Sequence, residues 1–348
     1  MAAPASPALF DQVTRGWRGY ALVVLIALAS ALFGASAMPP LDADEAQFAL
    51  ATRQMIEGGA RPADALIVHE AQAASIAALP GARLDDISPY RLPSALGLAL
   101  AAMACLWAGQ ALIGRRAALI GAGLLAAGLF ASFEGMNATP VALLLGFTTL
   151  AFAALAHLYR AEPLRTRVVA SIFWAALAWA FCIDALSAPV ALVLALGCLV
   201  IWERRAAWLR PLLWWPALLP AALTLAANAA MGAQLSTTIH ILGRHFQLPG
   251  YHTLLLPLLI FPATYALPAA ARLVIEALRT SIAQHAPFRF LIAWAGAVFL
   301  FAEFWPTKLP HYALPAYPAI ALMCGAGLSA MLGRRWRSAH PAGIVLFG

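Results

Sequence analysis

A succession of long apolar stretches, separated by short polar turns, most constrains what this 348-residue chain can fold into. Most of the stretches are roughly 17–25 residues long, which is the length that a helix needs to cross a bilayer. Only 11% of the residues are charged, whereas a soluble domain carries about 25%. Strands of a membrane barrel would alternate polar and apolar residues and would be about half as long. The sequence therefore predicts an all-α, polytopic integral membrane protein.

We expect about ten transmembrane helices, the fifth and sixth of which are short and form a hairpin. The first apolar stretch is too long for the core of a signal peptide, so we count it as a retained span. The predicted spans are 20–37, 92–113, 117–133, 139–159, 168–183, 189–202, 211–231, 251–272, 288–305 and 312–332.

The arginines predict the orientation of the chain. Sixteen of its 22 basic residues fall in alternate connections between the spans, and short arginine-rich connections stay in the cytoplasm. The other connections hold most of the acids. We therefore expect a cytoplasmic tail (1–19), a transmembrane domain (20–333) with two loops on the far face (39–91 and 232–250), and a cytoplasmic turn that begins a further apolar segment (334–348). Because the arginines lie between apolar stretches and form no single patch, nucleic acid is not expected as a partner.

Acidic residues first gather in the segment 38–59, MPPLDADEAQFALATRQMIEGG. Asp42 followed by Glu45 predicts an N-cap and a capping box after two prolines. Apolar and small residues then recur on one face, which predicts a helix lying in the membrane interface that ends at Gly58 and Gly59. A second helix of this kind is expected over 64–79.

Two interpretations of Asp42, Asp44 and Glu45 are open. They could form a solvated helix cap, or they could have a function, since acids close to a bilayer are costly. The functional interpretation gains support because the other unusual polar residues fall on the same face of the membrane. These residues are Arg53, Glu70, Arg91, Arg244, His245, His252, Lys308, His311 and Tyr312.

Lys308 is the only lysine in the chain. It lies in WPTKLPHYALPAYP, between the ninth and tenth predicted spans. A lysine at a helix end commonly extends its ammonium group to the interface. An isolated lysine beside His311 and Tyr312 could instead bind a phosphate as a point charge. Spacing does not separate the two interpretations.

Four sequence blocks resemble bacterial C-type (GT-C) glycosyltransferases of the aminoarabinose-transferase and protein O-mannosyltransferase kind. LDADEAQFALATRQMIEGG resembles the first external loop of this family, with its pattern DE-x-x-[YF]-A followed by R-x-M. YRLPSALGLALAAMACLWAGQALIGRRAALIGAGLL resembles the RLPS span and the turn after it, and FTTLAFAALAHLYR resembles the next span. TKLPHYALPAYPAIAL resembles the late K-L-P-x-Y-x-L-P-x-x-P motif. The blocks occur in family order and cover most of the chain.

The resemblance implies the GT-C fold and an enzyme that transfers a sugar from a polyprenyl-phosphate donor to a lipid, glycan or protein acceptor. The reaction would take place on the periplasmic face of the bacterial inner membrane. Asp44 and Glu45 match the Asp-Glu pair of the family, and Asp44 matches its catalytic aspartate. An aspartate beside a hydroxyl or amine acceptor can accept the proton as the new bond forms.

The resemblance also implies residues that bind the donor phosphate. Arg53 matches the arginine that follows the Asp-Glu pair, and Lys308 and Tyr312 match late-motif residues near the lipid phosphate. Arg91 and Arg244, on the same predicted face, are two further candidates for phosphate binding. Such cations favour the departure of a phosphate, most strongly in a dry site.

A divalent metal of unknown identity is the implied cofactor. Glu70 matches the acid before the K-P-P-L segment of the family, a position associated with metal. Either His245 or His252 matches the loop histidine that completes the metal site, and spacing does not decide between them. A carboxylate with an imidazole suits a transition metal better than magnesium.

Three departures from the family pattern favour an alternative function. HEAQAASIAAL replaces the K-P-P-L segment, NATPVALLL lacks the second catalytic aspartate, and Ser187 replaces the lysine of a K-G-P motif. Glu134 or Asp184 could supply an acid from the same face, although either could simply be a charge at a helix end. The alternative is a catalytically degenerate relative that binds polyprenyl lipid or is a scaffold for a cell-envelope complex.

Overall fold

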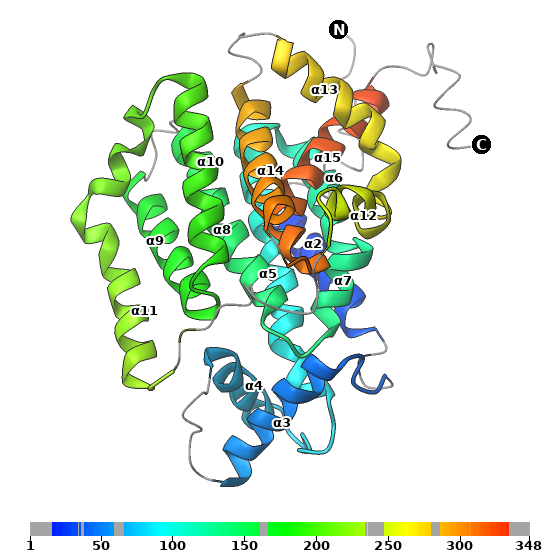
Figure 1. Ribbon diagram of the computed structural model, residues 1–348, viewed down its shortest axis with the longest axis vertical. Coiled ribbons are helices and arrows are strands. Elements are labelled where there is room, and N and C mark those ends of the chain that lie inside the picture. Colours follow the sequence, from blue (N-terminus) through cyan, green and yellow to red (C-terminus); the bar gives the residue numbers. More distant parts are fainter. Residues whose placement is uncertain are drawn as a thin grey trace, which may run out of the picture.

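The computed structural model describes residues 16–33, 35, 38–58, 66–160, 166–233, 235, 247–279, 286–305 and 307–333. Every long element in this part of the chain is a helix (Figure 1). The candidate residues Arg244 and His245 lie outside the described residues. The α-helices are α2 (Trp17–Leu32), α3 (Ala43–Gly58), α4 (Ile67–Ala78), α5 (Ser88–Leu112), α6 (Arg115–Ala126), α7 (Leu129–Met136), α8 (Val141–Tyr159), α9 (Thr166–Ile183), α10 (Ser187–Glu203), α11 (Leu219–Ala230), α12 (Tyr251–Leu259), α13 (Leu267–Arg279), α14 (Ala286–Phe304) and α15 (Tyr317–Gly333). Short 3-10 helices are η1 (Ala207–Leu213), η2 (Trp215–Leu218), η3 (Ala263–Ala266) and η5 (Pro310–Ala316).

Five helical segments of the described residues are long and apolar enough to cross a membrane. They are α5, α8, α9, α14 and the segment Pro310–Leu332. Three bent helix pairs pass the same test when each is taken as one span, which gives up to eight candidate spans. The protein is therefore a multi-pass, helical membrane protein, as the hydrophobic pattern predicted.

Small residues allow α5 and α8 to pack closely at the centre of the bundle. A Cβ atom on Gly97 of α5 would approach the backbone carbonyl group of Ala142 to 2.5 Å, and one on Gly146 of α8 would lie 2.7 Å from the Gly97 carbonyl oxygen. In a bilayer, apolar side chains gain little by leaving lipid for one another, so close backbone contact through small residues drives helix association. The same device joins α6 to α15, where Gly325 faces Gly121.

The helices α3 and α4 lie together at one end of the bundle, at the bottom of Figure 1. The Asp42 carboxylate accepts a hydrogen bond from the Glu45 backbone N–H at 2.6 Å, and the Glu45 carboxylate accepts one from the Leu41 N–H at 2.7 Å. The expected capping arrangement is therefore present, with Leu41 as the second donor. Both predicted helices of this region are confirmed as elements.

Replacing Gly325 by alanine is expected to destabilise the protein. The new Cβ would lie 2.4 Å from the Ala117 carbonyl oxygen and 2.5 Å from the Gly121 nitrogen, both of which are backbone atoms that cannot rotate away. Overpacking of this kind costs about 1–3 kcal/mol. Gly123→Ala is the matched control on α6, because a Cβ there would meet nothing within 4 Å and alanine gains up to about 1 kcal/mol of helix propensity. Thermal unfolding in detergent measures both, and equal melting temperatures would contradict the packing argument.

Candidate functional site

A fully buried ion pair joins Glu45 of α3 to Arg91 of α5, and both side chains have no exposed surface. The Arg91 Nε lies 2.7 Å from Glu45 Oε1, and Nη2 lies 3.1 Å from Oε2. The other three N–H groups of the guanidinium donate to carbonyl oxygens that follow α2. These belong to Ala35 at 2.6 Å, Met38 at 2.9 Å and Pro39 at 2.9 Å. All five donors of Arg91 are therefore used.

Both oxygens of the Glu45 carboxylate also accept hydrogen bonds. Besides the two bonds from Arg91, it accepts the Leu41 N–H and, at 2.9 Å, the Ala138 N–H. Burial would raise the pKa of Glu45, but the hydrogen bonds from Arg91, Leu41 and Ala138 outweigh it and hold the pKa below its usual value. The roles expected of Glu45 in catalysis and of Arg91 in phosphate binding stay predictions. In this structure the two side chains form an ion pair with each other and hydrogen bonds with the surrounding backbone.

Residues 137–140, between α7 and α8, are fixed by side chains from three other helices. The Ala138 peptide donates its N–H to Glu45 and accepts a hydrogen bond at 3.0 Å from Gln72 Nε2 of α4. Ser94 Oγ of α5 donates to the Thr139 carbonyl at 2.8 Å. The sequence resemblance places the missing second aspartate of the family in this segment. Neither Gln72 nor Ser94 was among the predicted site residues, although each is a polar side chain within an apolar helix, and Ser94 belongs to the RLPS block.

Asp44 lies beside this pair but faces the other way. Its side chain is exposed, and among the described residues it has neither a hydrogen bond nor an ion pair. Because Asp44 and Glu45 are neighbours in the first turn of α3, the buried pair fixes the backbone that carries Asp44. Arg53, later on the same helix, forms an exposed ion pair with Glu57 at 2.7 Å.

A second polar cluster surrounds Lys308, which is 3% exposed. Its ammonium group donates to the Gln247 carbonyl at 3.0 Å and to the Trp305 carbonyl at 2.7 Å. The His252 Nε2 lies 2.9 Å from the Leu309 carbonyl oxygen. Within the described part of the chain, Lys308 forms no ion pair, so its buried charge is met only by carbonyl dipoles.

The Glu303 carboxylate, next to this cluster, caps the N-terminus of α12. It accepts the backbone N–H groups of Gly250 at 2.7 Å and Thr253 at 2.8 Å. A carboxylate at a helix N-terminus satisfies free N–H groups and complements the helix dipole. The bond ties the end of α14 to α12, on either side of the Lys308 cluster.

A small cleft is lined by residues of η5, α8 and α10. His311, Tyr312 and Ser187 are the polar residues that line it. Of the two candidate substitute acids, Asp184 caps its own turn through the N–H of Leu186 at 2.9 Å and the hydroxyl of Ser187 at 2.9 Å. Glu134 is buried on α7.

The predicted metal site stays a prediction. Among the described residues, no group of three or more His, Cys, Asp or Glu side chains could hold an ion, and the candidate ligand His245 lies outside them. His252 lies against the Leu309 carbonyl, and its Nδ1 is 3.9 Å from Glu303.

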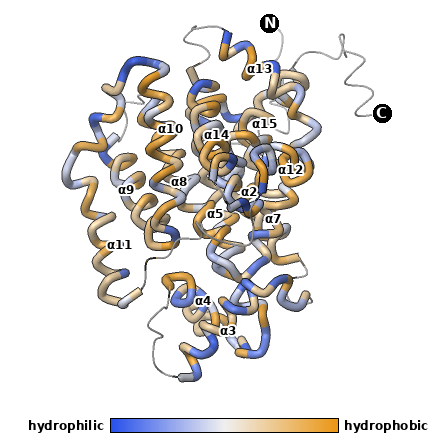
Figure 2. Tube along the Cα trace, viewed as in Figure 1, coloured by the Kyte–Doolittle hydropathy of each residue, from blue (hydrophilic) through white to orange (hydrophobic). Residues whose placement is uncertain are grey.

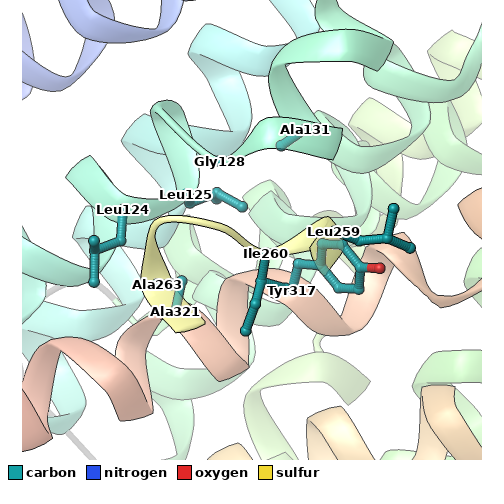
Figure 3. A pocket seen from close by; sticks show the side chains of 9 residues that line it. All are labelled: Leu124, Leu125, Gly128, Ala131, Leu259, Ile260, Ala263, Tyr317 and Ala321. Carbon is teal, nitrogen blue, oxygen red and sulfur yellow. The ribbon is translucent and has the colours of Figure 1, made fainter. Parts of the chain in front are cut away.

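A second small cavity is apolar apart from the Tyr317 hydroxyl (Figure 3). It lies where α6 and α7 meet at a 54° bend and where α12 and α13 meet at a 105° bend. The Leu129 N–H joins the two breaks by donating to the Phe261 carbonyl at 2.7 Å. With almost no polar lining, this cavity is not a site for charge-dependent chemistry.

Comparison with solved structures identifies the fold. ArnT from Cupriavidus metallidurans, solved with undecaprenyl phosphate, matches with a TM-score of 0.75 and 18% identity, over 93% of this chain and 62% of its own. An Archaeoglobus fulgidus oligosaccharyltransferase in its apo form matches with a TM-score of 0.62 and 10% identity, over 94% of this chain and 52% of its own. The arabinosyltransferase EmbB from Mycobacterium smegmatis matches with a TM-score of 0.51 and 16% identity, over 94% of this chain and 31% of its own.

These neighbours are all GT-C glycosyltransferases, and the chain has the GT-C fold. It spans less than two thirds of the length of ArnT. The same oligosaccharyltransferase is also solved with zinc and sulfate, and the archaeal AglB is solved with a dolichol phosphate. No protein-family model and no curated protein matches the sequence.

Arg91→Gln is expected to destabilise the protein strongly, because it leaves the Glu45 charge buried without a partner. Breaking a buried pair in this way costs about 3–5 kcal/mol. Arg83→Gln is the matched control, since Arg83 pairs with Asp85 in a bridge whose side chains are 75% and 58% exposed and such pairs contribute about 1 kcal/mol or less. Unfolding of both variants in detergent measures the difference. A similar loss of unfolding free energy in the two variants would show that the buried pair contributes no more to stability than the exposed one.

The pH dependence of stability should carry the signature of Glu45. Because its pKa is lower in the folded than in the unfolded protein, its contribution is complete above the unfolded pKa of about 4.3 and is lost as pH falls through the folded pKa. The wild-type melting temperature should therefore approach that of Glu45→Gln as pH falls below about 4.3. A constant gap between the two proteins from pH 7 down to acid unfolding would contradict the assignment.

Proposed function

We propose that this protein is a membrane glycosyltransferase that uses a polyprenyl-phosphate sugar as donor. The observation that carries the proposal is the match of 93% of the chain to the fold of ArnT, a structure solved with undecaprenyl phosphate. The partner is then a polyprenyl lipid that reaches the site from the bilayer. The acceptor is a lipid, a glycan or a protein.

The two polar clusters suggest a role in the reaction for each candidate residue. Asp44 accepts the proton of the acceptor hydroxyl or amine while the glycosidic bond forms, and its exposure leaves it open to an acceptor arriving from water. Glu45 and Arg91 position Asp44 by fixing the start of α3. Arg53 and Arg244 are two further candidates for binding the donor phosphate; Arg53 is paired with Glu57 on α3, and Arg244 is a candidate from the sequence alone.

Lys308 and Tyr312 bind the donor phosphate in this proposal. A buried ammonium group with no acidic partner is unfavourable, so an incoming phosphate would gain from pairing with it. Lys308 uses two of its three N–H groups for the carbonyls of Gln247 and Trp305. Tyr312 lines the small cleft. The phosphate that leaves with the lipid would be stabilised in the same place.

The topology proposed with this function has ten spans. The two shorter apolar helices, α2 and α10, join the five long segments and the three bent pairs. Each of these ten units overlaps one predicted apolar stretch. With the arginine-rich connections in the cytoplasm, α3 and α4 lie in the interface on the periplasmic face of the inner membrane.

The alternative is a relative that binds polyprenyl lipid without transferring a sugar. Two observations favour it. Ser187, which lines the cleft, stands where the family resemblance places a lysine, and Asp184 caps its own turn. Such a protein would keep the lipid site around Lys308 and lose the acceptor chemistry.

A transfer assay with variants tests the proposal. Purified protein in nanodiscs is given undecaprenyl-phosphate sugars with lipid, glycan or peptide acceptors, and mass spectrometry follows the release of undecaprenyl phosphate. Asp44→Asn is expected to lower turnover by about 10²-fold or more, which is the contribution typical of a general base. Asp85→Asn, a matched exposed acid in an ion pair with Arg83, should leave turnover unchanged.

Lipid retention separates the two functions. Wild-type protein that retains undecaprenyl phosphate during purification but turns over none of these sugars would favour the non-catalytic relative. Lys308→Met should lower lipid retention in either case, because it removes the buried cation. Wild-type levels of retention in this variant would remove Lys308 from the phosphate site.

A further inference from the structure

The helix α13, Leu267–Arg279, has three distinct faces. Successive residues of a helix are 100° apart, which separates its side chains into three sectors. The first sector is buried against the bundle and contains Ala270 at 4% and Ala277 at 1% exposure. A Cβ on Gly327 of α15 would lie 2.8 Å from the Ala270 nitrogen, so the contact with α15 is close.

The second sector is apolar but exposed. Ile275 is 45% exposed and Leu278 is 57% exposed, and they lie on adjacent turns of the helix. The third sector is polar and exposed, and it contains Arg272, Glu276 and Arg279. Along its length, α13 therefore presents an apolar strip and a charged strip side by side. Figure 2 shows that hydrophilic and hydrophobic residues are interspersed along this helix.

Neither water nor the centre of a bilayer suits both exposed sectors. In water, the strip with Ile275 and Leu278 would leave two large, adjacent apolar side chains exposed, which is unfavourable. In the hydrocarbon core, Arg272 and Arg279 would be costly. A helix in the membrane interface places the apolar strip against acyl chains and the charged strip among the headgroups.

The path of the chain agrees with an interfacial position. The 13 residues of α13 extend about 20 Å, which is shorter than the roughly 30 Å hydrocarbon core. The helix follows a 105° bend after α12. In Figure 1 it slants across the top of the bundle, at the end opposite α3 and α4.

We propose that the last two turns of α13 lie in the headgroup layer of the leaflet opposite α3 and α4, where Arg272 and Arg279 bind the phosphates of anionic phospholipids. Two guanidinium groups on one face, seven residues apart, complement a negatively charged lipid surface. The proposal depends on the membrane fold and is independent of the transfer reaction.

Spin labels test the position of the helix in the full chain. In nanodiscs of phosphatidylcholine and phosphatidylglycerol, single nitroxides are placed at 275, 276 and 278 after the native cysteines are replaced. Labels at 275 and 278 should collide more often with oxygen than with a water-soluble nickel chelate, and the label at 276 should show the reverse. A label at Val193, which is 67% exposed on α10, and one at Asp85 serve as lipid and water references.

Two results would overturn the position. A label at 278 as accessible to nickel as the label at Asp85 would place α13 in water. A label at 276 as shielded as the label at Val193 would place it in the hydrocarbon core.

The lipid preference has its own readout. A fluorophore at 278 is quenched by doxyl-labelled phosphatidylglycerol or, in a parallel sample, by doxyl-labelled phosphatidylcholine. Local enrichment of the anionic lipid should be roughly fivefold per arginine and should fall in 0.5 M salt. In the double variant Arg272→Gln with Arg279→Gln, quenching by the two lipids should become equal. An unchanged preference in that variant would refute binding by these arginines.

Discussion

The buried ion pair between Glu45 and Arg91 is the interaction on which the candidate site depends. Taking two charges out of water costs several kcal/mol per ion. The structure offsets this cost by filling every hydrogen-bonding position of both groups, with backbone atoms that follow α2, precede α3 and connect α7 to α8. The pair joins segments that are far apart in the sequence. Here it defines where α3 begins, and therefore where Asp44 lies.

Regular features of the sequence predicted most of the fold. Apolar stretches of membrane length identified the helices, and the Asp42–Glu45 spacing identified the start of α3 because capping is a local property. The sharp elbow between α12 and α13 was not foreseen, since the apolar stretch runs through it without a break in hydropathy. Pro257, Pro262 and Pro268 lie around that elbow, and each removes a backbone donor, but hydropathy does not record the loss.

The site was less predictable because it depends on contacts between distant residues. Glu45 and Arg91 are 46 positions apart, and no spacing rule pairs residues so distant. Asp44 and Glu45 were both predicted as catalytic candidates, yet a helix turns 100° between them. That rotation directs one carboxylate into the protein and leaves the other in contact with solvent. Gln72 and Ser94 hold residues 137–140. Gln72 belongs to no quoted motif, and Ser94 belongs to the RLPS block, but their contacts with this segment were visible only in the folded chain.

The two buried cations of the polar clusters differ in a way that bears on ligand binding. Arg91 has an acidic partner at 2.7 Å, so its charge is already neutralised and a phosphate would gain little from approaching it. Lys308 is equally hidden but is bonded to the carbonyl oxygens of Gln247 and Trp305, which solvate an ammonium group without cancelling its charge. In a medium of low polarity, an uncancelled charge attracts an anion strongly. Electrostatics therefore supports the proposal that Lys308 binds the donor phosphate, because its charge lacks the acidic partner that Arg91 has.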